Sequence, residues 1–352
     1  MEGAKCPFHP EFVPRLINMA LATWKKCTTS SLIRRSSQTL AVIGKTAYIY
    51  GGELRPREPV DAAIYCCTVC QDQSSQDSQI STIPAIGAPQ PRVGSSSTSL
   101  KGKLYLFSGR SGTAMAPIEE RGTLWSFDPQ IQSWAAITPI DTEAPFPPGR
   151  SYHALANDGD DTIYLHAGCP EKGRLADVWS FRLSQRQWQQ HAAAPGPPRG
   201  GTSIAFARGK LWRMNGFDGI KEQGGAVDVF DPADDRWTSI PFAADGKEGP
   251  IPRSVCCLLA LKMRGRDSLL TMFGESDPSN LGHQGAGKML GDIWAFDIES
   301  QHWQEIRTQD SKIPSPRGWF AADVVVAGRV LLQGGLSPSN DRLDDLWLLE
   351  LD

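Results

Sequence analysis

The sequence lacks the features that mark membrane proteins, secreted proteins and nucleic-acid-binding surfaces. No apolar stretch approaches the roughly 18 residues that a membrane-spanning helix needs, and the longest, Ala321–Ala327, is bounded by turn residues. The first 24 residues contain no apolar core between a basic start and a small-residue cleavage site, so we expect no secretory signal. The formal net charge is −3, from 36 basic and 39 acidic residues without long runs. This balance does not favour nucleic acid or a membrane as a partner.

Cysteine is sparse, with eight residues in the 352. Cys67 and Cys70 form one CxxC pair, with Cys66 beside it, but the second pair that a tetrahedral zinc site usually needs is missing. Another adjacent pair, Cys256–Cys257, lies in a strand-like run, where neighbouring side chains point to opposite faces. The pattern favours structural thiols over a metal or redox site. Without a secretory signal, we expect reduced thiols and a cytoplasmic protein.

What the sequence does contain is a repeat built from three markers. The first is an Arg that opens an apolar run, at Arg34 or Arg35, Arg92, Arg150, Arg199, Arg253 and Arg317. The second is a Gly that ends the next apolar run, at Gly51, Gly109, Gly168, Gly216, Gly274 and Gly334. The third is an aromatic strand followed by a turn and a Trp, as in LWSFDPQIQSW and IWAFDIESQHW. Each unit therefore predicts four short strands.

Six such units predict an all-β, six-bladed propeller, because one four-stranded sheet cannot bury both faces and a radial stack can. The markers resemble the kelch repeat. The last unit ends at DDLWLLELD without a terminal Trp strand, whereas the strand around Trp24 belongs to no complete unit. We therefore expect this N-terminal strand to complete the last blade and to remove exposed sheet edges. The whole chain, 1–352, is then a single domain, with an irregular arm over about residues 1–18.

One face of this propeller is expected to carry the function. The arginine-bearing loops and the loops after each marker Gly emerge on that face, where we expect the arginines to encircle the channel mouth. As substrate-binding residues we predict Trp319 and Phe217 as apolar walls, and an anion-receptive set comprising Arg92, Arg150, Arg199, Arg253 and Arg317. In the alternative interpretation, these arginines hold neighbouring loops together. The long loops Arg110–Gly122 and Glu275–Gly291 overhang the same mouth.

The segment 274–294 carries the most suggestive side chains. It places Glu275, Asp277 and His283 within nine positions of one Gly-rich loop. Two carboxylates and an imidazole with open coordination positions suit a non-haem Fe(II) site. In the alternative interpretation, Asp277 opens a turn and His283 stabilises the loop by hydrogen bonding. We predict these three residues as metal ligands and as catalytic residues.

The same loop resembles the site of the nitrile-specifier, epithiospecifier and thiocyanate-forming proteins. The resemblance implies iron held by a Glu-xxx-Asp-xxx-His pattern, which Glu275 and His283 match at its ends and in which Ser279 stands at the centre. It further implies a small anionic substrate and a lyase, isomerase or cyclisation step in specialised metabolism. The other hypothesis is a non-catalytic kelch module that docks a protein partner on its loop face. The sequence indicates no oligomeric state.

Overall fold

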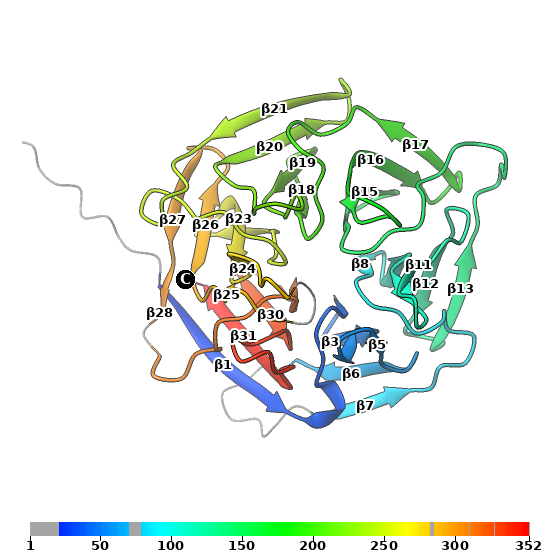
Figure 1. Cartoon of the computed structure of the whole chain (residues 1–352), viewed down its shortest axis with the longest axis horizontal. Coiled ribbons are helices and arrows are strands. Elements are labelled where there is room, and N and C mark those ends of the chain that lie inside the picture. The colour runs from blue at the N-terminus through cyan, green and yellow to red at the C-terminus, as the bar shows by residue number, and fades with distance from the viewer. Residues whose placement is uncertain (1–20, 70–78, 282–284, 309, 327, 352) are drawn as a thin grey trace, which may run out of the picture.

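The molecule is a ring of six antiparallel sheets around a central axis, as the computed structural model shows (Figure 1). The structure describes residues 21–69, 79–281, 285–308, 310–326 and 328–351. Within these ranges the one helical element is a 3₁₀ turn, η1 (Ser31–Ile33), and no helix is long and apolar enough to cross a bilayer. The predicted six-bladed, all-β fold is confirmed.

The first three blades each contain four strands in sequence order from the axis outward. Blade 1 contains β2 (Thr39–Ile43), β3 (Thr46–Tyr50), β6 (Ile64–Thr68) and β7 (Ile80–Ile83). Blade 2 contains β8 (Ser96–Leu100), β9 (Lys103–Phe107), β12 (Leu124–Asp128) and β13 (Ser133–Ile137). Blade 3 contains β14 (Ala154–Asn157), β15 (Thr162–Gly168), β16 (Leu175–Arg182) and β17 (Gln187–His191).

The next two blades repeat this order, and the last blade draws strands from both ends of the chain. Blade 4 contains β18 (Ser203–Ala207), β19 (Lys210–Met214), β20 (Ala226–Asp231) and β21 (Arg236–Pro241). Blade 5 contains β22 (Leu259–Met263), β23 (Arg266–Met272), β26 (Ile293–Asp297) and β27 (His302–Glu305). Blade 6 contains β29 (Ala321–Val324), β30 (Arg329–Gln333), β31 (Asp345–Leu351) and β1 (Leu21–Thr29).

Strand β1 closes the ring, as the sequence predicts. It pairs antiparallel with β31, with Trp24 opposite Leu349, and its start pairs in parallel with the short strand β28 (Arg307–Thr308). The Trp24 ring lies 6.3 Å from the ring of Trp347 and 6.0 Å from that of Phe273 in blade 5. The closing strand therefore contributes apolar packing to the junction of blades 5 and 6. The expected arm over residues 1–18 lies outside the described residues.

The outer half of four blades is held by one aromatic pair. The Phe of the third strand lies directly opposite the terminal Trp on the fourth, with ring centroids 4.9–5.3 Å apart. Facing aromatic side chains of this kind stabilise a strand pair beyond their burial alone. The pairs are Phe127–Trp134, Phe181–Trp188, Phe230–Trp237 and Phe296–Trp303. This contact explains the regular spacing of the third sequence marker.

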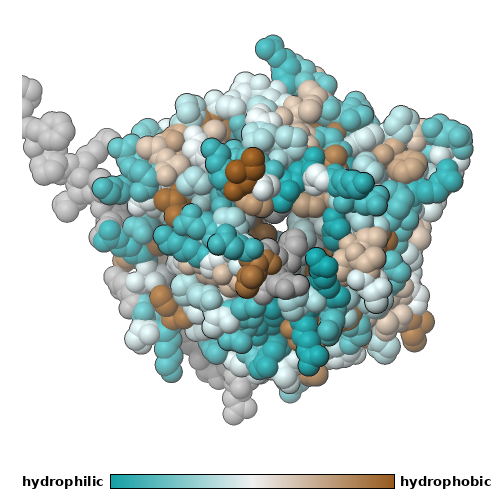
Figure 2. All heavy atoms as spheres, viewed as in Figure 1, coloured by the Kyte–Doolittle hydropathy of each residue, from teal (hydrophilic) through white to brown (hydrophobic). Residues whose placement is uncertain are grey.

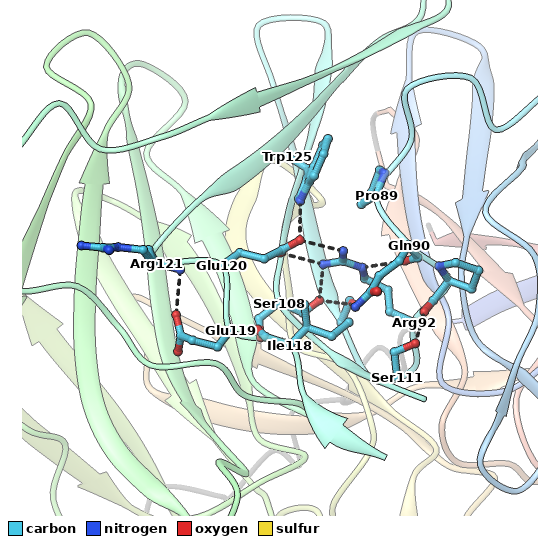
Figure 3. Close-up of polar contacts among 12 residues, drawn as sticks. Pro89, Gln90, Arg92, Ser108, Ser111, Ile118, Glu119, Glu120, Arg121 and Trp125 are labelled. Carbon is cyan, nitrogen blue, oxygen red and sulfur yellow. Dashed lines mark hydrogen bonds and ion pairs between the residues drawn. The ribbon is translucent and has the colours of Figure 1, made fainter. Parts of the chain in front are cut away.

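A second repeated contact joins the marker Arg to a carboxylate of its own blade. In blade 2, the guanidinium of Arg92 donates to both oxygens of Glu120 at 3.0 Å, and Trp125 donates its indole N–H to the same carboxylate (Figure 3). Arg92 also donates to the carbonyl oxygens of Gln90 and Ser108 (Figure 3). We call this Arg–carboxylate–Trp arrangement the latch. It fixes the strand-entry loop to the third strand.

The latch recurs in three further blades. Each again has a bidentate Arg–carboxylate pair, with distances of 2.6–2.9 Å, and an indole donor. The sets are Arg150–Asp177–Trp179, Arg253–Asp292–Trp294 and Arg317–Asp345–Trp347. All four latch arginines are at most 1% exposed. A bidentate, charge-assisted pair is among the stronger polar contacts available to a protein.

Blades 1 and 4 lack the latch. In blade 1, Arg35 stacks on the ring of Tyr65, with its guanidinium carbon 4.3 Å from the centroid, and donates to the carbonyl oxygens of Gly51 and Leu32. In blade 4, Arg199 donates only to the carbonyl oxygens of Pro197 and Asn215 within the described residues. The six-fold repeat is therefore broken at two positions.

Candidate functional site

A closed ring of backbone hydrogen bonds forms the base of the loop face. The residue two positions after each marker Arg donates its N–H to the carbonyl oxygen of its counterpart in the preceding blade, at 2.7–3.1 Å. Its members are Ser37, Gly94, Tyr152, Gly201, Val255 and Trp319. All six have a positive φ, between 46° and 64°. For a β-branched residue such as Val255 this backbone conformation is costly, which the closed ring of hydrogen bonds must offset.

The aromatic side chain of Tyr152 packs against Gly94, the preceding member of this backbone ring. A side chain at Gly94 would meet the Tyr152 ring at about 3.0 Å, so only glycine leaves the aromatic ring room there. Burial raises the pKa of the Tyr152 hydroxyl, as does the nearby charge of Glu53. Tyr152 therefore stays protonated at neutral pH and presents a neutral phenol near the axis.

The axis itself holds a cavity of about 470 Å³. The innermost strand of every blade lines it; β8 contributes a run of hydroxyl-bearing residues, Ser96 to Ser99, and β2 and β18 contribute Thr39 and Ser203. Trp319 lines this cavity, and its predicted role as an apolar wall for a substrate stays a prediction. Phe217 is not among its lining residues, because its ring faces the guanidinium of Arg174 at 4.8 Å.

The predicted substrate-binding arginines do not face the cavity. Their side chains lie within the blades, 0–7% exposed, and none of the set Arg92, Arg150, Arg199, Arg253 and Arg317 lines the cavity. Four of them are held in latches. These contacts give the arginines a structural role, in agreement with the alternative interpretation of the sequence. Their role in binding an anion stays a prediction.

Loops that follow the marker glycines surround the mouth above the ring. Three of them form short hairpins: β4 (Glu53–Arg55) with β5 (Glu58–Pro59), β10 (Arg110–Ser111) with β11 (Ala116–Pro117), and β24 (Glu275–Ser276) with β25 (Lys288–Met289). Figure 1 labels β24 and β25 close to the centre of the propeller, and β5 and β11 within blades 1 and 2. The residue opening each of the six loops bridges to the segment after a marker Arg. The inner ring thereby fixes the position of the mouth side chains.

Carboxylates gather where blades 4 and 5 meet at the mouth. Glu275 is 4% exposed and Glu222 is 8% exposed. Burial raises the pKa of Glu275 to about 7, and the charge of Glu222 adds to this. Burial also raises the pKa of Glu222, with a contribution from the charge of Asp277, which is itself exposed. Neither buried carboxylate forms an ion pair with a described residue.

Glu275 is positioned by its own hairpin. Its Oε1 accepts a hydrogen bond from the backbone N–H of Gly287 at 2.7 Å, and a Cβ at Gly287 would lie 2.7 Å from that oxygen. The glycine therefore lets the hairpin backbone approach the carboxylate closely. Glu222 accepts a 3.5 Å hydrogen bond from the Ser254 hydroxyl and lies on the short bridge that pairs it with Phe217. Glu222 belongs to no repeated marker, so no pattern in the sequence singles it out as a site residue.

Cations lie on another side of the mouth, around blades 2 and 3. Arg110 spans these blades by donating to the Ser151 hydroxyl and to the carbonyl oxygens of Cys169 and Pro170. Arg174 stacks on Phe217, and both guanidinium charges lower the pKa of the Cys169 thiol against a larger rise caused by burial. The mouth is thus polarised, with positive charge near blade 3 and acidic groups between blades 4 and 5. Arg110 opens a marker loop, a signal that could have identified it.

The predicted metal ligands are only partly placed. Glu275 and Asp277 lie in one hairpin loop, whereas His283 lies outside the described residues. Among the residues that the structure does describe, no three His, Cys, Asp or Glu side chains form a group that could hold a metal ion. The described carboxylates alone therefore do not make a metal site, and such a site would require His283. The Fe(II) assignment stays a prediction, as does the catalytic role of these residues.

The cysteines show no disulfide among the described residues. Cys66 and Cys67 are buried and form no disulfide with a described residue, in agreement with structural thiols, while Cys70 lies outside the described residues. Burial raises the pKa of Cys66 to about 11. A thiol of this kind is protonated at neutral pH and is a poor nucleophile.

Two known proteins are similar in sequence to this chain along most of its length. The chain is 28% identical over 347 residues to the N-(sulfonatooxy)prop-2-enimidothioate sulfolyase of Thlaspi arvense, covering 90% of this chain and 93% of that protein. It therefore resembles an enzyme of the nitrile-specifier type, as the Glu275 loop indicates. It is also 24% identical to an F-box/kelch-repeat protein of Arabidopsis thaliana, covering 92% of this chain and 56% of that protein.

Fold and family follow from two further similarities. A solved structure, that of YjhT, superimposes with a TM-score of 0.66 at 17% identity, covering 92% of this chain and 99% of that one, which shows the shared fold. Residues 37–274 match the family described as the KLHDC2/KLHL20/DRC7 Kelch-repeats domain. The chain belongs to this family of kelch-repeat propellers.

Proposed function

We propose that this chain is a small-molecule lyase whose reaction takes place at the loop-face mouth. The observation that carries the proposal is the buried carboxylate pair of Glu222 and Glu275, which no described cation neutralises. A pair of this kind costs folding free energy, and such groups cluster at functional sites. The similarity to a sulfolyase over nearly the full length of both chains supports the reaction class.

The mouth offers complementary groups to the two ends of such a substrate. In the proposed reaction, the bond to an oxyanion leaving group breaks, and the bonding electron pair departs with the anion. The positive charge of Arg110 and Arg174 attracts that anion, while the carboxylates of Glu275 and Glu222 stabilise positive charge that develops on the remaining fragment. Trp319 supplies apolar surface beside the axis. The closed backbone ring holds these groups in fixed relative positions.

The test uses N-(sulfonatooxy)prop-2-enimidothioate, the compound named in the similar sulfolyase, which is released in situ from its glucoside precursor. Products are quantified by gas chromatography and mass spectrometry with the protein present and absent. We expect wild type to change the product ratio and Glu275→Gln to lower this effect about 100-fold, the order of magnitude typical for removing one electrostatic contact to the transition state. Glu299→Gln, at an exposed turn, is the control. A wild-type ratio equal to that of the protein-free reaction contradicts the proposal.

Binding of iron at this site would need His283 as a ligand beside Glu275. If Glu275 and His283 hold Fe(II) with open positions, the ion supplies Lewis-acid chemistry at the mouth. Metal analysis of the purified protein, with Glu275→Ala and His283→Ala alongside, tests this. We expect iron in wild type and its loss from both variants. Wild type without iron that keeps its full effect on the products contradicts the iron assignment and leaves the lyase proposal standing.

A second candidate function is docking of a protein partner on the loop face. Three overhanging loops expose apolar side chains, Leu54, Ile220 and Leu281, at 49%, 88% and 71%. Figure 2 shows isolated apolar side chains among polar ones on the face that carries the mouth. The similarity to an F-box/kelch-repeat protein supports this candidate. The product assay separates the two functions, because a protein that only docks a partner leaves the product ratio unchanged.

A further inference from the structure

The broken repeat in blade 4 leaves an arginine without its carboxylate. In blades 3 and 5, the latch Asp lies four residues before the Phe that faces the terminal Trp. In blade 4, that Phe is Phe230, so the latch position is Ala226. The methyl group of alanine cannot accept a hydrogen bond from the arginine. Blade 4 therefore keeps the donor of the latch and lacks its acceptor.

Arg199 otherwise has the same anchorage as the latched arginines. Its Nε donates to the carbonyl oxygen of Pro197 and its Nη1 to that of Asn215, as Arg150 donates to Pro148 and Ala167. Among the described residues, no acceptor bonds its second terminal nitrogen, Nη2. In blade 3, the corresponding nitrogen and Nη1 bind the two oxygens of Asp177. The fork of Arg199 is thus oriented for a carboxylate that the chain does not supply.

The missing carboxylate is not replaced by the acids nearby. Asp228 and Asp218 favour the charged form of Arg199, yet neither forms an ion pair with it. Asp218 is instead bonded to the backbone of its own turn. Asp228 accepts a hydrogen bond from Ser239 and has Arg213 at 3.6 Å as its ion-pair partner. One carboxylate therefore serves two buried guanidinium groups.

Arg213 adds to the surplus of positive charge. It is 1% exposed, and its Nε and Nη2 have no hydrogen-bond partner among the described residues. At the corresponding place, three residues before the marker Gly, blades 2 and 3 have Leu106 and Leu165, and blade 5 has Thr271. Burial and the charge of Arg199 lower the pKa of Arg213 to about 9. Two buried cations with one carboxylate make a local excess of one positive charge, which is unfavourable in a protein interior.

Solvent reaches the place where the latch carboxylate would be. The latch acids of the other blades have side-chain exposures between 11% and 26%. Arg199 is 7% exposed, more than Arg35 and the four latch arginines, whose exposures lie between 0% and 2%, and Ala226 is partly exposed. An anion can therefore arrive from solution without opening the blade.

We propose that blade 4 binds a small carboxylate anion against Arg199, at the position that the latch acid occupies in blades 2, 3, 5 and 6. The anion receives a bidentate pair of hydrogen bonds from Nη1 and Nη2, the geometry that guanidinium and carboxylate groups prefer. It neutralises the positive charge that Arg199 and Arg213 leave uncompensated. This site is separate from the mouth and does not depend on the proposed lyase function.

Formate is the probe, because its single C–H proton reports contact with the protein by saturation-transfer NMR. We expect a signal with wild type and with Ala226→Ser, and at least a tenfold weaker signal with Ala226→Asp, whose own carboxylate fills the position. Ala226→Asp is also expected to melt about 1–2 °C above wild type, because it supplies the carboxylate for Arg199, although Asp228 stands where the latched blades have the latch Trp. The melting temperature shows that the loss of signal is not a loss of folding.

A second variant tests the same inference in the opposite direction. Asp177→Ala creates the blade 4 arrangement in blade 3, so formate is expected to raise its melting temperature more than that of wild type, at constant ionic strength. Three results would each overturn the proposal. They are no saturation transfer from wild type to formate, an undiminished signal with Ala226→Asp, and a formate-induced rise in melting temperature that is no larger for Asp177→Ala than for wild type.

Discussion

Two sets of buried carboxylates in this propeller have opposite surroundings. In the latches, burial alone would raise the pKa of Asp345 and of Asp292, but the bonds from Arg317 and Arg253 more than reverse this, and both pKa values lie below their ordinary range. At the mouth, burial raises the pKa of Glu275 to about 7, and the charge of Glu222 adds to this rise. Buried carboxylates are thus paired with arginine within the blades and left without an ion pair at the mouth.

This difference separates stability from chemistry. A latch acid has every strong partner it can use, with two bonds from arginine and one from tryptophan. An acid at the mouth costs free energy in the folded state and gains a stabilising partner only when a substrate or an ion arrives. We infer that the marker arginines, although they are the most prominent sequence feature, mainly stabilise the blade to which each belongs. In the proposed function, the less conspicuous loop acids Glu222 and Glu275 are the reactive groups.

Removing a latch acid is expected to have the largest effect on stability. Asp345→Ala leaves Arg317, which is 0% exposed, without its counter-ion, and loss of one partner of a buried pair costs about 3–4 kcal/mol of unfolding free energy. Urea denaturation measures this cost. The neighbouring Asp344→Ala is the matched control, because its ion pair with Arg34 is largely exposed and is worth little. Equal effects of the two substitutions would contradict the latch.

The next prediction compares a latched arginine with an unlatched one. Arg150→Met leaves Asp177 without its cation and is expected to lower the unfolding free energy by about 3 kcal/mol. Arg199→Met removes a buried charge that has no carboxylate partner, so we expect a loss of about 1 kcal/mol or less. Denaturant titrations of both variants at pH 7 provide the comparison. A cost for Arg199→Met as large as that for Arg150→Met would show that blade 4 neutralises its arginine in another way.

A smaller effect is expected from Asp323, an unpaired acid in blade 6. Burial raises its pKa to about 6, although the N–H groups of Val42 and Val324 donate to its carboxylate. Because the folded state holds this proton more tightly than the unfolded state, whose pKa is about 3.9, stability falls as pH rises from about 4 to 6. Asp323→Asn is expected to remove this fall and to gain about 2 kcal/mol at pH 8. Unfolding measured at pH 4 and pH 8 tests this, and a variant that is less stable than wild type at pH 8 would contradict it.

The fold was predictable because its signals are local and repeated. Six marker arginines, six glycines and the Phe–Trp spacing each report one blade, and the unmatched strand around Trp24 indicated where the ring closes. The latch could also have been predicted from the sequence, since an Asp stands two residues before Trp179, Trp294 and Trp347. In blade 2, Glu120 takes this role from five residues before its Trp, so the spacing there is different.

The mouth could not be predicted in the same way. Glu222 and Glu275 come from different blades, 53 positions apart, and meet only because consecutive blades stack. Neither the burial of Glu275 nor the stacking of Arg174 on Phe217 leaves a local pattern in the sequence. Repeats specify the scaffold, whereas the groups that we propose to be reactive lie in loops that the repeats do not constrain.

The most direct test measures stability and product formation together for one variant of each region. Asp177→Asn breaks a latch, and Glu275→Gln alters the mouth. We expect Asp177→Asn to melt several degrees below wild type and to keep its effect on the product ratio at a temperature where it is folded. Glu275→Gln should melt at or above the wild-type temperature and lose that effect. A Glu275→Gln variant with wild-type activity, or a folded Asp177→Asn variant without activity, would contradict the division between latch and mouth.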